Sequence, residues 1–230
     1  MNAKKLSFLL LILVAVACTN RSTSSEQDEM RHWNNVLQQI NALLLENKAR
    51  QTLDLAKQTL PEILESAEKN GTTDTLIYYA RKIFNACGNN YINTKQYKDG
   101  IDYMDSIGNH PLIREHCPHE LLSFKAGLNQ LYGNNPEAVR LAEDYLQLPV
   151  CTSANDFIRQ AEIISGVYMY SGNNLPKAIQ ILEKAIDVYR KGGNFPNMLR
   201  IMSRLGIYYH LSGEYEKAIA TNQEAIATYN

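Results

Sequence analysis

Tryptophan and phenylalanine are scarce in this sequence, and positive charge is not in excess. The 230 residues include one Trp and five Phe but 14 Tyr, a balance that favours helices which bury an aromatic ring and keep its hydroxyl near water. Lys plus Arg number 23 against 24 for Asp plus Glu, and the balance is 21 against 24 once Lys4 and Lys5 of the N-terminal leader are left out. Such a mildly acidic chain has no electrostatic basis for binding nucleic acid directly.

Catalytic motifs are missing as well. The sequence contains no nucleophile elbow, phosphate-binding loop, metalloprotease helix or dinucleotide fingerprint. Several glycines stand beside asparagines, as in Asn70-Gly71 and Gly133-Asn134, where they fit helix ends better than a phosphate cradle. We therefore expect a protein that is not an enzyme and that uses no cofactor.

The one long apolar run lies at the N-terminus. Two lysines precede an apolar stretch from Leu6 to Ala17 that only Ser7 interrupts. A run of about 12 residues is too short to span a bilayer as a helix. The layout is that of a secretory signal peptide, so we expect residues 1–17 to be removed.

The end of this leader resembles a bacterial lipobox, in which a cysteine is diacylated and becomes the new N-terminus. The stretch is Ala15-Val16-Ala17-Cys18, and the resemblance implies lipidation at Cys18. A flexible polar tether would follow at residues 18–27. The chain would then be an exported, membrane-anchored lipoprotein facing the periplasm, with the outer membrane favoured over the inner. The alternative is an ordinary signal peptide in which Cys18 is incidental.

From about Asp28 onward, nearly every segment has the 3.6-residue apolar period of a helix, and no alternating run predicts a strand. The domain at residues 28–230 is therefore expected to be all-α. Two segments, 163–189 and 204–229, also resemble each other. With one residue inserted in the turn, the alignment pairs Tyr168 with Tyr209, Gly172 with Gly213, Ala178 with Ala218, Ala185 with Ala225 and Tyr189 with Tyr229.

Earlier copies of this unit repeat its main positions. In the third copy, Leu128 lies forty residues before Tyr168 and Ala138 forty before Ala178. The fourth copy aligns with the last one at four places: Cys87-Gly88 with Leu205-Gly206, Tyr91 with Tyr209, Tyr97 with Tyr215, and Gly100 with Ala218. A degenerate fifth copy places Ala49, Leu53 and Ala56 at second-helix positions. Together the copies indicate a helical repeat.

These residues resemble the tetratricopeptide repeat, whose pattern runs aromatic, Leu-Gly, Tyr, Gly-x-Tyr, Ala and Ala. The resemblance implies a right-handed superhelical solenoid of about five antiparallel helix pairs. We expect the pairs 28–46 with 48–69, 73–93 with 97–107, 118–132 with 135–147, 154–171 with 175–191, and 196–211 with 215–230.

Small residues explain how such helices approach each other. Gly206 and Ala218 sit where the two helices of the last pair cross, and Tyr209 and Tyr215 are expected to fill the space around the crossing. Ala225 would leave room for the first helix of a following repeat. Terminal repeats normally carry a polar capping helix, so we expect the last pair to be covered by chain beyond Asn230, by a dimer or by a partner.

One cluster of potential metal ligands lies between the second and third pairs: His110, His116, Cys117 and His119. Imidazoles and thiolates suit zinc or copper, but the spacing around Pro118 is too tight to close a tetrahedron, and no second Cys/His pair completes one. We expect no metal site here and a polar loop that enters a helix. Cys87 is expected to be a buried thiol, and a Cys117–Cys151 disulfide stays open.

A solenoid of this family offers a concave face lined by the first helix of each pair. Some family members hold a peptide carboxylate there with basic residues and asparagines. The expected exposed positions, besides His119, are Lys82, Asn85, Asn89, Asn93, Asn129, Gln130, Arg159, Glu162, Tyr170, Arg200, Arg204 and His210. A merely solvated helix face is the alternative.

The leading function is therefore a non-enzymatic module that binds a protein or peptide. The second hypothesis is regulatory, because the chain resembles the N-terminal sensor of membrane-tethered tetratricopeptide transcriptional regulators. Their transmembrane and helix-turn-helix parts are not in this sequence. An enzyme built on helical repeats is a weaker third reading, because it needs inward-facing acid pairs.

Overall fold

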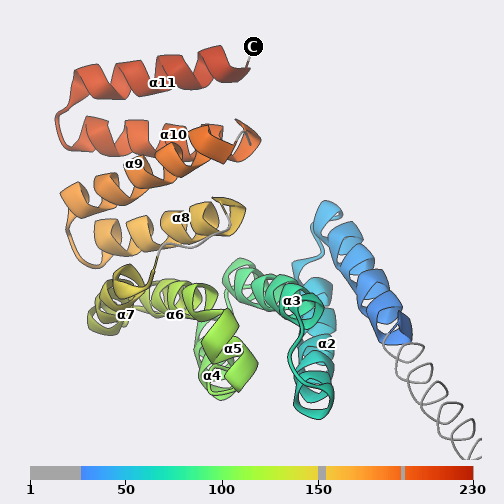
Figure 1. Cartoon of the computed structure of the whole chain (residues 1–230). Coiled ribbons are helices and arrows are strands. Elements are labelled where there is room, and N and C mark those ends of the chain that lie inside the picture. Colours follow the sequence, from blue (N-terminus) through green and yellow to red (C-terminus); the bar gives the residue numbers. More distant parts are fainter. Residues whose placement is uncertain (1–26, 150–153, 193–194, 230) are drawn as a thin grey trace, which may run out of the picture. The chain divides into compact units, whose positions relative to one another are not determined.

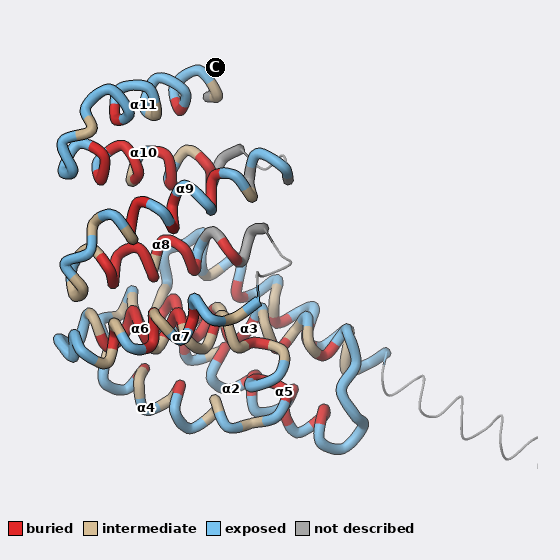
Figure 2. Tube along the Cα trace, turned by 60° about the vertical axis from the view of Figure 1, so that its left-hand side comes forward, coloured by how far each residue is buried: buried red, intermediate tan, exposed pale blue. Residues whose placement is uncertain are grey.

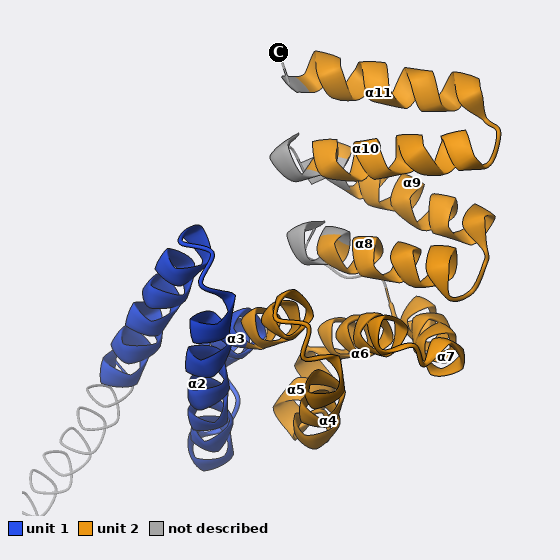
Figure 3. Ribbon diagram, turned by 180° about the vertical axis from the view of Figure 1, so that it is seen from behind, with its two compact units in different colours: residues 1–83 blue, residues 84–230 orange. Residues whose placement is uncertain are grey.

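The computed structural model describes residues 27–149, 154–192 and 195–229. Every regular element in these ranges is a helix, as the sequence predicts (Figure 1). The chain divides into two compact units, residues 1–83 and 84–230, and the boundary falls inside helix α3, Asp74–Asn93 (Figure 3). Cys18 and the predicted signal peptide lie outside the described residues.

The first unit is a helix pair followed by the beginning of α3. A helix at residues 27–45 pairs with α2, Ala49–Asn70. Trp33 and Ile40 are buried on the first helix, and Leu60 and Ile63 are fully buried on α2. The ring centroid of Trp33 lies 5.7 Å from that of Tyr79, so the start of α3 packs onto the same core.

Helix pairs also build the second unit. The pairs are α3 with α4 (Tyr97–Ile107), α6 (Pro118–Tyr132) with α7 (Asn135–Gln147), α8 (Ala154–Tyr170) with α9 (Leu175–Gly192), and α10 (Phe195–Leu211) with α11 (Tyr215–Tyr229). These bounds agree with the predicted pairs to within about two residues. Successive pairs stack, since α6 packs on α8 and α10 packs on α9. None of the helices in the described ranges is both long and apolar enough to cross a bilayer.

The turns inside the pairs end in the same way, which fixes the repeat register, although the turn after α8 is one residue longer than the others. Each turn contains one residue with positive φ: Asn47, Lys95, Gly133, Asn173 and Gly213. The N–H of the next residue bonds back to a carbonyl near the end of the first helix, as in Gln96 to Tyr91 and Glu214 to Tyr209. A left-handed residue followed by such a bond is a standard helix ending.

This register confirms most of the sequence alignment. The carbonyls that close the turns in the second unit belong to Tyr91, Asn129, Tyr168 and Tyr209. Three residues before each of them lies a small buried residue: Gly88, Ala126, Ser165 and Gly206. The alignment of the third copy was one residue off, because Asn129 and not Leu128 corresponds to Tyr168.

Close approach explains why these positions are small. A β-carbon placed on Gly88 would lie 2.4 Å from the ring of Phe124, and one on Gly206 would lie 2.5 Å from Oδ1 of Asn222. Ala218 is buried, but the side chain closest to Gly206 is that of Asn222 and not of Ala218 as predicted. Tyr209 is also buried, but Tyr215 is exposed and does not fill the crossing.

The segment 110–117 differs from the prediction of a polar loop. It forms a short helix, α5 (Pro111–His116), whose Leu112 and Ile113 are buried. Nδ1 of His110 accepts the N–H of Leu112 at 3.2 Å and so caps this helix. The apolar pair Leu-Ile needs a core contact, which explains the helix, and Cys117 then precedes α6 as predicted.

Candidate binding surface

The residues that the sequence assigns to a binding face lie on the first helices of the pairs. Lys82 belongs to the part of α3 in the first unit, where its Nζ lies 5.6 Å from the ring centroid of Tyr78. Asn85, Asn89 and Asn93 belong to the part of α3 in the second unit. The remaining predicted residues lie on α6, α8 and α10.

Three of these residues are buried, although we expected them to be exposed. They are Asn89, Asn129 and Glu162. The amide Nδ2 of Asn89 donates to the carbonyl of Asn85, and that of Asn129 donates to the carbonyl of Lys125 at 2.8 Å. Buried amides need such partners, so these asparagines serve the helices themselves.

Three predicted residues on α8 and α10 are in direct contact. Nη2 of Arg200 lies 2.6 Å from Oε2 of Glu162, and Nη1 of Arg204 donates to the backbone carbonyl of Glu162 at 3.0 Å. Tyr170 lies further along α8 and is 69% exposed. We call Arg159, Glu162, Tyr170, Arg200 and Arg204 the α8–α10 surface.

The charges on the α8–α10 surface are unequal. The side chain of Glu162 is 9% exposed and that of Arg200 58% exposed, so this ion pair has a buried carboxylate and an outward guanidinium. Burial raises the pKa of the neighbouring Tyr208, and Arg204 opposes part of that rise because its charge favours the phenolate. Arg200 and Arg204 meet the one carboxylate of Glu162, so these three residues together carry a positive charge.

The other predicted residues do not join this surface. The ring of His210 packs against that of Tyr215, with centroids 5.3 Å apart, near the end of α10. Gln130 is half-buried on α6, and its Oε1 would lie 3.8 Å from a β-carbon placed on Gly166 of α8. Asn93 is exposed at the end of α3.

A similar arrangement of a tyrosine, a glutamate and a lysine, which the sequence analysis missed, joins successive helix pairs twice, with the glutamate bound to the lysine in one case and to the tyrosine in the other. Lys177 of α9 donates to both carboxylate oxygens of Glu143 on α7, at 2.6 and 2.7 Å, and its Nζ lies 4.7 Å from the ring centroid of Tyr168 on α8. One repeat later, Tyr209 donates to Glu183, and Nζ of Lys217 lies 5.3 Å from the ring centroid of Tyr209.

We call this contact the Tyr–Glu–Lys link. The two links have nearly the same spacing, with the glutamate 25 or 26 residues before the tyrosine and the lysine 9 or 8 after it. That spacing is the signal from which the sequence could have revealed it. Since a link joins the second helix of one pair to both helices of the next, it fixes how the pairs stack.

Comparisons with known proteins agree with this architecture. Residues 161–230 match the tetratricopeptide repeat. Two solved structures with the same kind of fold are the nearly identical TPR-like repeats of a putative kinesin light chain from Podosopora anserina and a double mutant of MamA RS-1.

The kinesin light chain structure is 12% identical to this chain, with a TM-score of 0.52, and the alignment covers 85% of this chain and 94% of the other. The MamA mutant is 15% identical, with a TM-score of 0.50 and coverage of 88% and 95%. At such low identity the likeness shows the fold alone. No curated protein matches the chain.

The histidines and cysteines are dispersed among the tetratricopeptide-like helices. His110 caps α5, and Nε2 of His119 donates to the carbonyl of Pro149 at 2.7 Å. Cys87 is buried, as predicted, with its Sγ within hydrogen-bonding reach of the Tyr103 hydroxyl, and Cys117 is also buried. Cys151 lies outside the described residues. Within the described ranges, no three His, Cys, Asp or Glu side chains come together as a metal site would require.

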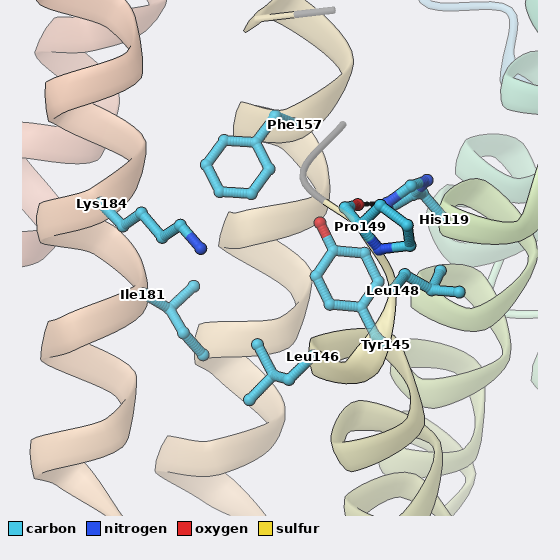
Figure 4. Close-up of a pocket in the computed structure, with 8 residues that line it drawn as sticks. All are labelled: His119, Tyr145, Leu146, Leu148, Pro149, Phe157, Ile181 and Lys184. Atoms are coloured by element: carbon cyan, nitrogen blue, oxygen red, sulfur yellow. Dashed lines mark hydrogen bonds between the residues drawn. The ribbon is translucent and has the colours of Figure 1, made fainter. Parts of the chain in front are cut away.

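A small hollow lies where α6, α7, α8 and α9 of these repeats meet (Figure 4). Its volume is about 40 Å³. The lining residues are His119, Tyr145, Leu146, Leu148, Pro149, Phe157, Ile181 and Lys184. Such a space holds a water molecule or two. It therefore offers no room for a peptide, and the α8–α10 surface is the better candidate for binding.

Proposed function

We propose that the chain is a non-enzymatic protein-binding module that holds a segment of a partner on the α8–α10 surface. The observation that carries the proposal is the geometry of Arg200 and Arg204. Both guanidinium groups are anchored on the one residue Glu162, while most of the Arg200 side chain faces solvent. Two arginines that are held in place lose little freedom when a ligand binds.

The charge of this surface specifies the partner. The guanidinium groups of Arg200 and Arg204 outnumber the one carboxylate of Glu162, which already pairs with Arg200, so they favour a segment that brings carboxylates or backbone carbonyls. The exposed ring of Tyr170 adds an amphipathic contact of the kind common in binding surfaces. The partner is therefore an acidic segment in an extended or helical conformation.

A site-specific crosslink tests the proposal. The photoreactive residue p-benzoylphenylalanine replaces Tyr170 in the full chain, and cells are irradiated before the crosslinked species are separated and sequenced. The matched control places the same residue at Gln180, which is exposed on α9. We expect discrete crosslinked partners from position 170, and we expect Arg200→Glu to reduce their yield at least about fivefold because it reverses the charge that faces the partner.

Equal crosslinking from positions 170 and 180 would contradict the proposal. So would an unchanged yield in Arg200→Glu, provided that circular dichroism shows the variant to be as helical as the parent. Arg200→Glu also leaves the buried Glu162 without its ion pair, and this could unfold the chain. The variant Arg200→Gln therefore serves to separate a loss of binding from a loss of helicity. That variant removes the charge but keeps a hydrogen-bond donor.

We further propose that the module is exported and lipid-anchored at Cys18. The supporting observations are the two lysines, the apolar run from Leu6 to Ala17 and the small residues before Cys18. Labelled palmitate should enter the chain in bacterial cells and should be lost in Cys18→Ala. Palmitate that persists in Cys18→Ala, or a chain that is never labelled, overturns this part.

A further inference from the structure

The last helix pair exposes a group of large apolar side chains. Ile207 and Leu211 of α10 and Tyr215, Ile219 and Ile226 of α11 are each more than half exposed. A hollow of about 350 Å³ lies among them, lined by Gly206, Ile207, His210, Tyr215, Ala218, Ile219 and Asn222. We call Ile207, Leu211, Tyr215, Ile219, Asn222 and Ile226 the end face. Figure 2 shows that α11 is exposed along most of its length.

The α11 part of this face has an equivalent on α9 that lies inside the protein, whereas Leu211 of α10 corresponds to Tyr170, which is 69% exposed. The shared turn geometry sets Glu214 in register with Asn174, so Tyr215, Ile219, Asn222 and Ile226 correspond to Leu175, Ile179, Leu182 and Ile186. Ile179, Leu182 and Ile186 are buried, and α10 packs on that helix. Within the described ranges nothing covers the end face, although it has the composition of an interior surface.

Ala225 does not contribute to this face. The sequence suggested that it awaits a covering helix, but Ala218 and Ala225 are already buried in the core with α10. The uncovered residues are Ile219 and Ile226, each of which directly follows one of the two buried alanines in the sequence. The surface that needs a partner is therefore larger and more apolar than a pair of alanines.

Charge favours a copy of the same chain as that partner. The residues that line the hollow include no Asp, Glu, Lys or Arg. On α11, Lys217 lies over the ring of Tyr209 and Glu224 binds Arg190 at 2.6 Å, so both point elsewhere, whereas Glu216 lies at the edge of the face, directly after Tyr215. A face without charge can meet itself without like-charge repulsion.

The spacing of the face also suits a twofold axis. Tyr215, Ile219, Asn222 and Ile226 are separated by four, three and four residues, an order that reads the same in reverse. A twofold axis makes the two helices antiparallel, so Tyr215 of one copy would lie opposite Ile226 of the other, and Ile219 opposite Asn222. We propose that two copies of this chain associate through their end faces, with α11 packed against α11.

The size of the face predicts a weak dimer. Five half-exposed apolar side chains and their surroundings would bury on the order of 1,000 Å² in total, at the lower end of specific interfaces. We therefore expect a dissociation constant of about 1 to 100 μM. The test is sedimentation equilibrium of the full chain over this range, in a nonionic detergent whose density the buffer matches, so that the apolar N-terminal run stays soluble.

Three variants make the test specific. Ile219→Glu places a charge at the centre of both faces and should weaken association at least about a hundredfold. Asn222→Leu restores the residue type found at Leu182 and should strengthen association at least about fivefold, because an amide no longer enters an apolar contact. Leu45→Glu is the matched control, since Leu45 is 86% exposed in the first unit and far from the end face in sequence, and it should change nothing.

Each outcome of this experiment either supports or overturns the proposal. A concentration-dependent dimer that responds in this order supports the proposal, with circular dichroism confirming that each variant is folded. A parent chain that stays monomeric up to about 100 μM overturns it, as does a dimer that Ile219→Glu leaves unchanged. The proposal is also overturned if the chain is monomeric and binds a different protein, and if only Ile219→Glu abolishes that binding. The end face would then bind a helix of that other protein.

Discussion

Single positions in the turns carry much of the information for this fold. Of the five residues with positive φ, Gly133 and Gly213 adopt the left-handed conformation without a steric cost, and Asn47 and Asn173 adopt it more easily than most residues do. Lys95 is the exception, with φ of 59°. Its turn is nevertheless built like the others, because the hydrogen bond from Gln96 to Tyr91 closes it.

We predict that Gly213→Ala destabilises the chain by about 1 kcal/mol, because its φ of 82° places a β-carbon in the left-handed region. A β-carbon there would contact nothing within 4 Å, so the cost is that of the backbone alone. Urea unfolding followed by circular dichroism measures it.

Gly166→Ala is the matched control, and its effect should have the opposite sign. Gly166 lies inside α8. A β-carbon placed on it would lie 3.8 Å from Oε1 of Gln130, which is an ordinary van der Waals contact. Alanine in a helix interior should stabilise the chain by about 0.5 to 1 kcal/mol. Equal effects of the two substitutions would show that the positive φ of Gly213 has no energetic consequence.

Between elements, the Tyr–Glu–Lys link decides how one pair stacks on the next. Tyr209 donates to Glu183, and burial, followed by the interaction with Glu183, raises the pKa of Tyr209 above its ordinary value. The lysine of each link lies over the tyrosine ring, where a cation is attracted by the π electrons. The stacking therefore combines apolar burial with an oriented polar contact.

A double-mutant cycle should detect the link. We predict that Tyr209→Phe and Glu183→Ala, each made alone and together, show a coupling free energy of about 1 kcal/mol, because each single change already removes the same hydrogen bond. Unfolding of the four proteins in urea gives the value. Strict additivity would mean that Tyr209 acts only through the burial of its ring.

The first link predicts a dependence on pH. The hydrogen bond from Lys177 holds the pKa of Glu143 below its ordinary value of 4.5. A lowered folded-state pKa adds stability above the unfolded pKa, and this stability is lost as the pH falls through the folded value. We expect the stability difference between the parent and Lys177→Met to be smaller at about pH 3.5 than at pH 7, as measured by urea midpoints.

Only part of that difference should vanish in acid. The contact between Lys177 and the ring of Tyr168 does not titrate over this range, so it continues to favour the parent. A difference that is the same at both pH values would show that the ion pair with Glu143 contributes nothing.

At the scale of the whole molecule, each pair of the second unit depends on its neighbours. The pair α8 and α9 has a packed neighbour on both sides, since α6 contacts α8 and α10 contacts α9. The pair α10 and α11 has one such neighbour among the described residues. In a stack of repeats, local stability follows the number of packed faces.

We therefore predict that amide hydrogens in the middle of α11 exchange at least about tenfold faster than those of α8 when the chain is dilute. Hydrogen exchange followed by mass spectrometry measures both helices in one sample. Equal protection of α8 and α11 at low concentration would contradict the prediction. Protection of α11 that rises with concentration would agree with the association of end faces.

The sequence predicts the helices well because their signals are local. A 3.6-residue apolar period, a small residue such as Gly206 and a turn residue such as Gly213 act within a few residues of themselves. Errors occurred where the outcome depends on a distant segment. Residues 111–116 form a helix because Leu112 and Ile113 find a core, and Tyr215 is exposed because no helix in the described residues packs against it.

The candidate surface was harder to predict for the same reason. Its register places the predicted residues on α3, α6, α8 and α10, and Arg200 and Arg204 lie together with Glu162. The burial of Asn89, Asn129 and Glu162 could not be read from their own helices, because it depends on how closely the neighbouring helices approach. The Tyr–Glu–Lys link was missed because its members lie about 25 residues apart.

The sequence by itself determined that this protein consists of antiparallel helix pairs, since turn residues and apolar periods act over short distances. Only the tertiary structure decided which polar groups are buried, that Glu162 anchors two arginines, and that Ile219 and Ile226 are left exposed while Ala225 is covered. Those outcomes depend on the closeness and angle of helices from different pairs, which are fixed when the whole stack packs.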